Sequence, residues 1–167
     1  MLVQRITLYD RLEIELVPDG DVTVECPGLE LAVGAQNIVE KSARLFLQHV
    51  GSGQGVKLTV DKKIPAAAGL GGGSSDAAAV LEALDDMLGT GLPRAELRAL
   101  GRRIGAEVPF VLYKQTALAT GIGDRIEAWP GLPSVWLVLV TPGIDVSTAW
   151  AFQKLGQALG LTQHRAI

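Results

Sequence analysis

Three segments of the chain alternate apolar and polar residues, which is the pattern of a half-buried β-strand. The first is Arg11–Leu16, and the second, Val22–Cys26, follows it after the turn-forming residues Pro18–Asp21. Because so short a turn usually joins neighbouring strands, we expect these two to pair as a hairpin. The third segment, Val56–Val60, predicts a strand that leads the chain towards Pro65.

Three other segments space their apolar residues three and four positions apart, as amphipathic helices do. The first predicted helix covers Asn37–Val50, with the side chain of Asn37 as its N-cap. The second covers Ser75–Leu88 and ends at Gly89, and the third covers Arg94–Arg103.

The last third of the chain predicts short strands and then one more helix. The strands are expected at Pro109–Leu112, Ala117–Thr120, Arg125–Glu127 and Trp136–Val140. Ser147 or Thr148 caps a final helix that runs to Ala158. Strands and helices mix without a regular β–α–β alternation, so the predicted fold class is α+β.

Composition indicates a folded chain with a core of its own, since 48% of the 167 residues are hydrophobic. The net charge is −3 with both signs interspersed, which argues against a nucleic-acid partner. No apolar run could cross a bilayer and no signal peptide is evident, so we expect a cytoplasmic protein without a membrane partner. A single cysteine, Cys26, and two distant histidines predict no metal site made of protein ligands.

The candidate chemistry lies in the segment Pro65–Ser75, which reads PAAAGLGGGSS. Glycine lets a ligand approach the main chain closely, and the helix that follows offers unpaired N–H groups and the positive end of its dipole. Serine hydroxyls can cap that helix, contact a phosphate or reach a phosphate-bound Mg²⁺. Together these features predict a site for a nucleotide phosphate. The alternative is an ordinary glycine-rich turn with a serine cap.

This loop lacks the Gly-Lys-Ser/Thr of the Walker A pattern and the third glycine of the dinucleotide pattern. It resembles the phosphate-binding loop of the GHMP kinases, Pro-x-x-x-Gly-Leu-Gly-(Gly)-(Gly)-Ser-Ser-x-Ala. The resemblance implies ATP and Mg²⁺ as cofactors. The nucleotide-binding residues that it implies are Pro65, Ala68, Gly69, Leu70, Gly71, Gly72, Gly73, Ser74 and Ser75.

The resemblance extends from about Gln4 to Phe152 and implies the N-terminal domain of that family. Its fold is that of domain 2 of ribosomal protein S5, a mixed sheet packed against helices with a left-handed β–α–β crossover. On this basis we expect an ATP-binding domain over residues 1–152 that lacks its first strand. Residues 153–167 are then the start of a linker to a C-terminal domain, a partner that this sequence does not contain.

Two residues outside the loop resemble nucleotide contacts of the family. Asn37 matches an asparagine near the adenine, and Lys62, in Lys62-Lys63-Ile64-Pro65, matches a lysine near the base. Each has a plainer alternative, since Asn37 is a good N-cap and Lys62 could be a solvated charge at a strand end. We expect each residue to serve both purposes.

The segment Gly105–Phe110 reads Gly-Ala-Glu-Val-Pro-Phe and resembles the family's Gly-Ala-Asp-Val-Pro-Phe. There the aspartate accepts the proton of the substrate hydroxyl as its oxygen attacks the γ-phosphate, so Glu107 is the candidate catalytic residue. Glutamate reaches further than aspartate, and a displacement of about 1 Å can cost on the order of 100-fold in rate. The alternative is a surface glutamate at a helix end.

The segment Thr141–Thr148 resembles the family's Asn-Pro-Gly-x-x-Val-Ser-Thr, and the resemblance places Thr148 and Phe152 near a cytidine. Phe152 could instead be a core residue of its helix. The run GLGGGSSDAAA is similar to the branch that phosphorylates a hydroxyl of 4-diphosphocytidyl-2-C-methyl-D-erythritol in isoprenoid precursor biosynthesis. Another small-molecule substrate within the family and a non-catalytic ATP-binding fragment remain as alternatives.

Two opening segments of the family, Pro-Ala-Lys-x-Asn-Leu and Asp-Gly-Tyr-His, have no counterpart in this sequence. In the family that lysine pairs with the catalytic carboxylate. We therefore expect these 167 residues alone to be weakly active or inactive.

Overall fold

The computed structural model describes residues 1–28, 37–66, 68–121, 125–140 and 148–158, except the side chains of Thr148, Ala149 and Phe152. Its strands form two three-stranded sheets. The larger sheet has the spatial order β2 (Arg11–Val17), β4 (Gly55–Asp61), β3 (Val22–Glu25). The smaller sheet has the order β1 (Leu2–Val3), β5 (Ala117–Thr120), β6 (Arg125–Ala128) and is antiparallel throughout.

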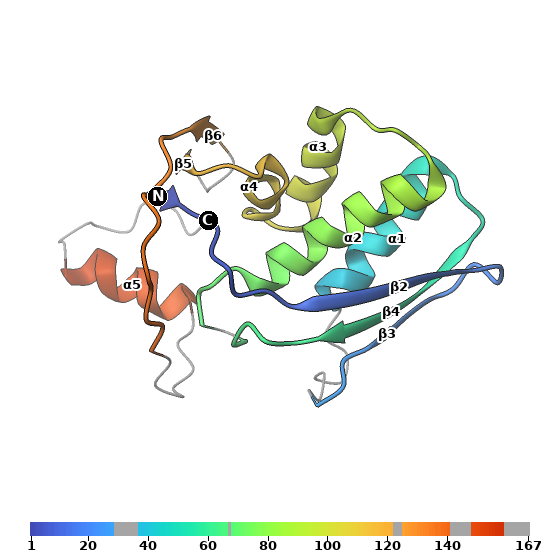
Figure 1. Cartoon of the computed structure of the whole chain (residues 1–167), viewed down its shortest axis with the longest axis horizontal. Coiled ribbons are helices and arrows are strands. Elements are labelled where there is room, and N and C mark those ends of the chain that lie inside the picture. Colours follow the sequence, from blue (N-terminus) through green and yellow to red (C-terminus); the bar gives the residue numbers. More distant parts are fainter. Residues whose placement is uncertain (29–36, 67, 122–124, 141–147, 159–167) are drawn as a thin grey trace.

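Two long helices, α1 (Ile38–Val50) and α2 (Gly72–Leu88), lie side by side over one face of the larger sheet (Figure 1). Helices α3 (Arg94–Ile104) and α4 (Val108–Tyr113) pack against each other and against α2. Helix α5 (Thr148–Ala158) is the last described element. The larger sheet and the α1–α2 pair thus form two layers, with α3 and α4 adding to the helical side.

The core lies between these layers because alternate strand residues face the helices. Leu12 pairs with Val60 and Ile14 with Leu58, and these apolar side chains lie on the buried face. Exposed glutamates such as Glu13 occupy the positions between them. Fully buried side chains from α1, β4 and α2 fill the centre, among them Phe46, Leu58, Leu81 and Leu84.

The predicted hairpin of β2 and β3 is wrong, because β4 lies between them, antiparallel to β2 and parallel to β3. The turn after β2 therefore crosses the start of β4, where the N–H of Val56 donates to the carbonyl of Asp21 at 2.7 Å. A Cβ on Gly55 would lie 2.2 Å from that carbonyl oxygen, so only glycine fits there. In the central position of β4, Val56, Leu58 and Val60 are all buried.

The strand predicted at Pro109–Leu112 is also wrong, since these residues lie in α4. A short apolar run does not distinguish a buried strand from a buried helix. Pro109 is tolerated because the first helical turn needs no N–H from it. Helix α4 packs closely on α3, where a Cβ on Gly101 would lie 2.9 Å from Cγ1 of Val108.

The third correction concerns Trp136–Val140, which forms no strand although its composition predicts one. No described segment offers it a partner for its N–H and C=O groups. Trp136, Val138 and Val140 are 101%, 89% and 84% exposed.

The other predicted elements are confirmed to within a few residues. Helix α2 begins earlier than predicted, at Gly72, so its first turn includes part of the glycine run. None of the helices among the described residues is long and apolar enough to span a membrane.

The crossing at Gly55 makes a test of the strand order. Gly55→Ala should lower the free energy of unfolding by about 1–3 kcal/mol, because its methyl group would overlap the backbone of Asp21. Gly53→Ala is the matched control, since nothing lies within 4 Å of a Cβ there, and it should change stability by less than about 0.5 kcal/mol. Urea unfolding of the two variants measures the difference, and equal stabilities would contradict the crossing.

Candidate functional site

The glycine-rich loop connects the end of β4 to the start of α2. Gly69 and Gly71 have φ values of +70° and +68°, a conformation that favours glycine. Gly71 is the N-cap of α2 and makes no side-chain cap, and the first turn of the helix carries no acidic residue. The first N–H groups of α2 therefore lack a side-chain acceptor and can receive an anion.

The two ends of this loop are in contact with each other. A Cβ on Gly72 would lie 2.9 Å from Cγ2 of Ile64 and 3.3 Å from Nζ of Lys62. Glycine at position 72 thus lets the first turn of α2 start directly against the chain that leaves β4. The lysine ammonium lies at this contact.

Lys62 is held by two carboxylates that come from distant parts of the chain. Its Nζ donates to Oδ2 of Asp76 at 2.8 Å and also to Oδ2 of Asp10. The other oxygen of Asp10 accepts the N–H groups of Lys63 at 2.5 Å and Ile64 at 2.8 Å. The side chains of Asp10, Asp76 and Lys62 are only 1%, 6% and 19% exposed, so this is a buried network.

The two carboxyl groups of this network differ in their proton affinity. Burial raises the pKa of Asp76 from 3.8 to about 6, although the Lys62 ammonium opposes the shift. Burial acts the same way on Asp10, but hydrogen bonds from Lys62 and from the N–H groups of Ile64 and Lys63 outweigh it and lower the pKa. For Lys62, burial is outweighed by both carboxylates, so its pKa is raised. Asp76 is thus the member of the network that titrates near neutral pH.

The start of α1 lies beside the start of α2, since a Cβ on Gly73 would lie 3.4 Å from Cγ2 of Ile38. Asn37 is the N-cap of α1, as predicted, and its Oδ1 accepts the N–H of Val39 at 3.0 Å. Its Nδ2 donates to Sγ of Cys26 at 3.6 Å. Asn37 therefore lies one residue from the contact with the loop, with both polar atoms of its side chain engaged.

Glu107 lies next to the loop although it is more than 30 residues further along the chain. Its Oε2 lies 3.5 Å from the position that a Cβ on Gly71 would take. The residue precedes α4, is exposed, and does not use its carboxylate to cap that helix. The structure thus brings a carboxylate and the candidate phosphate loop together.

The remaining predicted site residues divide into two groups. Ser74 and Ser75 lie in the first turn of α2, and Pro65, Ala68 and Leu70 lie on the loop before it. Thr148 belongs to the backbone of α5, but its side chain and that of Phe152 lie outside the described residues.

Sequence reasoning missed Asp10 and Asp76. An aspartate before a strand and another near the start of a helix both have the pattern of ordinary solvated charges. No spacing links positions 10, 62 and 76, because only the pairing of β2 with β4 brings the first two together. The one available signal was that Asp76 occupies an otherwise small and apolar face of α2, next to Ala77.

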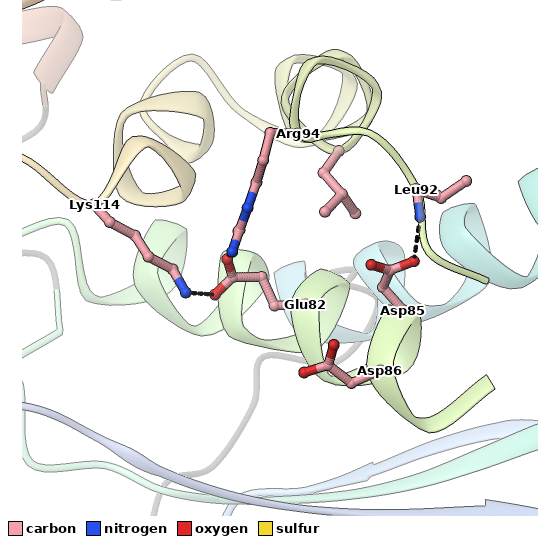
Figure 2. A pocket seen from close by; sticks show the side chains of 7 residues that line it. Glu82, Asp85, Asp86, Leu92, Arg94 and Lys114 are labelled. Atoms are coloured by element: carbon pink, nitrogen blue, oxygen red, sulfur yellow. Dashed lines mark hydrogen bonds and ion pairs between the residues drawn. The ribbon is translucent and has the colours of Figure 1, made fainter. Parts of the chain in front are cut away.

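A pocket lies between α2, α3 and the end of α4 (Figure 2). It is lined by Glu82, Asp85, Asp86, Leu92, Arg94, Leu97 and Lys114. Glu82 pairs with Arg94 and with Lys114, the latter at 2.9 Å, and Asp85 accepts the N–H of Leu92 at 2.9 Å. These contacts join three helices. Since the pocket lies at least ten residues along α2 from Gly72, about 15 Å, it is separate from the loop.

Comparison with known proteins matches most of this chain to one family. Residues 37–115 match the family model described as the GHMP kinases N terminal domain. A curated protein of Syntrophotalea carbinolica named 4-diphosphocytidyl-2-C-methyl-D-erythritol kinase is 50% identical over 155 residues, which is 93% of this chain and 55% of that protein. A protein of the same name from Geobacter sp. strain M21 is 45% identical and covers 96% of this chain and 57% of its own length. The chain spans about half the length of these relatives.

Solved structures agree with the sequence comparison. A crystal structure of 4-(cytidine 5'-diphospho)-2C-methyl-D-erythritol kinase superposes with a TM-score of 0.65 and 34% identity, covering 86% of this chain and 50% of the other. Homoserine kinase from Cytophaga hutchinsonii superposes with a TM-score of 0.60 at 19% identity, covering 91% of this chain and 57% of the other, a likeness of fold. The predicted α+β fold class is confirmed.

The raised pKa of Asp76 predicts how stability depends on pH. The folded state keeps the proton of Asp76 up to about pH 6, whereas an unfolded chain releases it near 3.8. Protonation between these values therefore stabilises the folded state, and this stabilisation is lost as the pH rises through about 6. Relative to Asp76→Asn, the free energy of unfolding of the wild type should fall by about 1–3 kcal/mol between about pH 4 and pH 7.

Urea titrations at a series of pH values measure this difference, in which the contributions of groups common to both proteins largely cancel. Asp86→Asn is the matched control, because Asp86 is an exposed aspartate on the same helix. It should follow the wild type at every pH. A wild type that runs parallel to Asp76→Asn would show that Asp76 is not the titrating group.

Proposed function

This chain belongs to the GHMP kinase family, and from that premise we propose that it forms the nucleotide-binding part of an ATP-dependent small-molecule kinase. The observation that carries the proposal is the start of α2, where uncapped N–H groups follow the glycine-rich loop and the Glu107 carboxylate lies alongside. An anion site next to a carboxylate is what phosphoryl transfer to an alcohol requires.

In this proposal the triphosphate of ATP lies along the loop from Pro65 to Ser75. The glycines permit close approach of the main chain, and the first N–H groups of α2 bind phosphate oxygens. Ser74 lies in the first turn of α2, and its hydroxyl is proposed to contact a phosphate. Mg²⁺, bound with the nucleotide, supplies neutralisation of phosphate charge. Asn37 and Lys62 are proposed to lie near the adenine end of the nucleotide.

Glu107 is the proposed catalytic residue. A carboxylate accepts the proton of the attacking hydroxyl if it stays ionised and lies within hydrogen-bond reach. Glu107 is exposed and its carboxylate makes no capping hydrogen bond to α4, so its side chain can turn towards a substrate at the loop.

The proposed substrate is 4-diphosphocytidyl-2-C-methyl-D-erythritol, because that compound is part of the names of relatives that share 40–50% of their aligned residues with this chain. Thr148 and Phe152 are proposed to contact its cytidine. We further propose that residues 1–152 form the ATP-binding domain and that a C-terminal domain completes the site. Helix α5 continues past residue 152 to Ala158, so the expected linker from residue 153 begins as helix.

The loop is tested by nucleotide binding. Gly71→Ala forces a side chain into a backbone conformation of positive φ at the N-cap of α2, and we expect it to weaken MgATP binding about tenfold or more. Gly91→Ala introduces the same kind of strain, at φ +61°, in a turn outside the loop. It should leave the dissociation constant within about twofold of the wild type. Titration calorimetry gives both values, and equal weakening in the two variants would remove the loop from the site.

The role of Glu107 is tested by phosphoryl transfer from MgATP to the proposed substrate. Glu107→Gln should leave MgATP binding nearly unchanged and reduce any turnover by about 100-fold or more, because the amide cannot accept the proton. Glu107→Asp is the conservative variant that restores the residue type of the family. MgATP binding without transfer, in the wild type and in Glu107→Asp alike, would instead identify a non-catalytic nucleotide-binding protein.

A further inference from the structure

The contacts around Lys62 join both ends of the glycine-rich loop. We propose that Asp76 is a positioning residue of this loop, which acts through the Lys62 ammonium to hold the first turn of α2 against the end of β4. The effect of Asp76 on the position of the loop is independent of the proposed function, whereas its effect on ATP affinity rests on that proposed function.

The first step of the argument is geometric. The loop begins after Lys62–Ile64 and ends at Gly72, and Lys62 Nζ lies 3.3 Å from a Cβ position on Gly72. Asp76 accepts from that ammonium at 2.8 Å from within α2, one turn beyond the start of the helix. The ammonium therefore joins the residues that enter the loop to the helix that leaves it.

The second step is that the entry side is itself fixed. Asp10 lies just before β2 and accepts three hydrogen bonds, from the side chain of Lys62 and from the N–H groups of Lys63 and Ile64. The backbone that enters the loop is thus attached to the larger sheet. With Asp10 as the fixed anchor, the hydrogen bond from Lys62 to Asp76 links the start of α2 to this anchor.

The third step concerns charge. Two buried carboxylates share one ammonium, so the network carries a net negative charge when both are ionised. That charge lies beside the uncapped N–H groups of α2 and opposes the binding of an anion there. Protonation of Asp76, favoured by its burial, would make the network neutral while a carboxyl oxygen remains to accept from Lys62.

Other charged groups near the start of α2 are few among the described residues. Glu107 approaches Gly71 from the start of α4, Lys62 comes from the end of β4, and Asp10 from before β2. Helix α1 presents the apolar Ile38. Burial raises the pKa of Asp76 to about 6 whereas that of Asp10 is lowered, so between these two carboxylates it is the charge of Asp76 that protonation removes near neutral pH.

The test uses Asp76→Ala, which removes the acceptor, and Asp76→Asn, which keeps an oxygen acceptor without the charge. Asp86→Ala and Asp86→Asn, on the exposed side of the same helix, are matched controls. Lys62→Met, alone and with Asp76→Ala, asks whether Asp76 acts through the ammonium. Amide hydrogen exchange over residues 68–75, relative to amides of β4, is measured first without nucleotide.

We expect Asp76→Ala to accelerate exchange over residues 68–75 about tenfold, while Asp76→Asn and both Asp86 variants stay near the wild type. In the Lys62→Met background, Asp76→Ala should add nothing further, because the two residues act as one unit. Equal exchange in Asp76→Ala and Asp86→Ala, or an undiminished effect of Asp76→Ala without Lys62, would overturn the proposal. If Asp76→Ala does not fold, Lys62→Met alone must show the same local acceleration.

The charge is tested with MgATP. At about pH 7.5, Asp76→Asn should bind MgATP about threefold more tightly than the wild type, and the two should converge near pH 5.5. The protonation of ATP itself cancels in this ratio, and Asp86→Asn should show no such trend. An unchanged ratio across pH overturns the electrostatic part of the proposal. If no variant binds MgATP, the proposed function fails, and hydrogen exchange still decides whether Asp76 positions the loop.

Discussion

One buried ammonium, that of Lys62, joins the three segments on which the candidate site depends. Asp10 lies just before β2, Lys62 directly follows β4, and α2 contributes Asp76 from its second turn. An ammonium buried with a single partner would gain little stability once its desolvation is counted. Here Lys62 also donates to Asp76, and Asp10 also accepts the N–H groups of Lys63 and Ile64, so both charges of the Lys62–Asp10 pair are hydrogen-bonded. The network therefore fixes the positions of these groups. Both ends of the loop are fixed in this way, and Gly69 and Gly71 between them adopt the positive φ values that glycine permits.

The position of β4 makes that arrangement possible. As the central, most buried strand, it brings its last residues between the start of β2 and the start of α2. Gly55 lies at the start of β4 and Gly72 lies where the loop enters α2. Each lets neighbouring segments approach where a side chain would collide. A rigid sheet and helix thus present the loop, which is a common arrangement for binding sites.

Features encoded by neighbouring residues could be predicted from the sequence, and features that depend on distant residues could not. The N-cap at Asn37 and the end of α2 at Gly89 follow from local chemistry, and the loop was evident from its glycines. The pairing order of β2, β4 and β3 depends instead on which strand is most buried, and a short turn suggested the wrong neighbour. For the same reason the partners of Lys62 were missed, since Asp10 is 52 residues away in the sequence.

The glutamate at position 107 shows how the scaffold bears on chemistry. Its backbone is set by α4, which Gly101 allows to pack closely on α3 through Val108. From that fixed start the longer side chain brings Oε2 to within 3.5 Å of the Cβ position on Gly71. An aspartate on the same backbone would withdraw its carboxylate from Gly71 by about one carbon–carbon bond, on the order of 1.5 Å. Helices α3 and α4 fix the backbone of Glu107, and the Lys62 network fixes the loop at Gly71. The extra methylene of Glu107 must therefore be accommodated by rotation of its own side chain or by the position of the substrate hydroxyl.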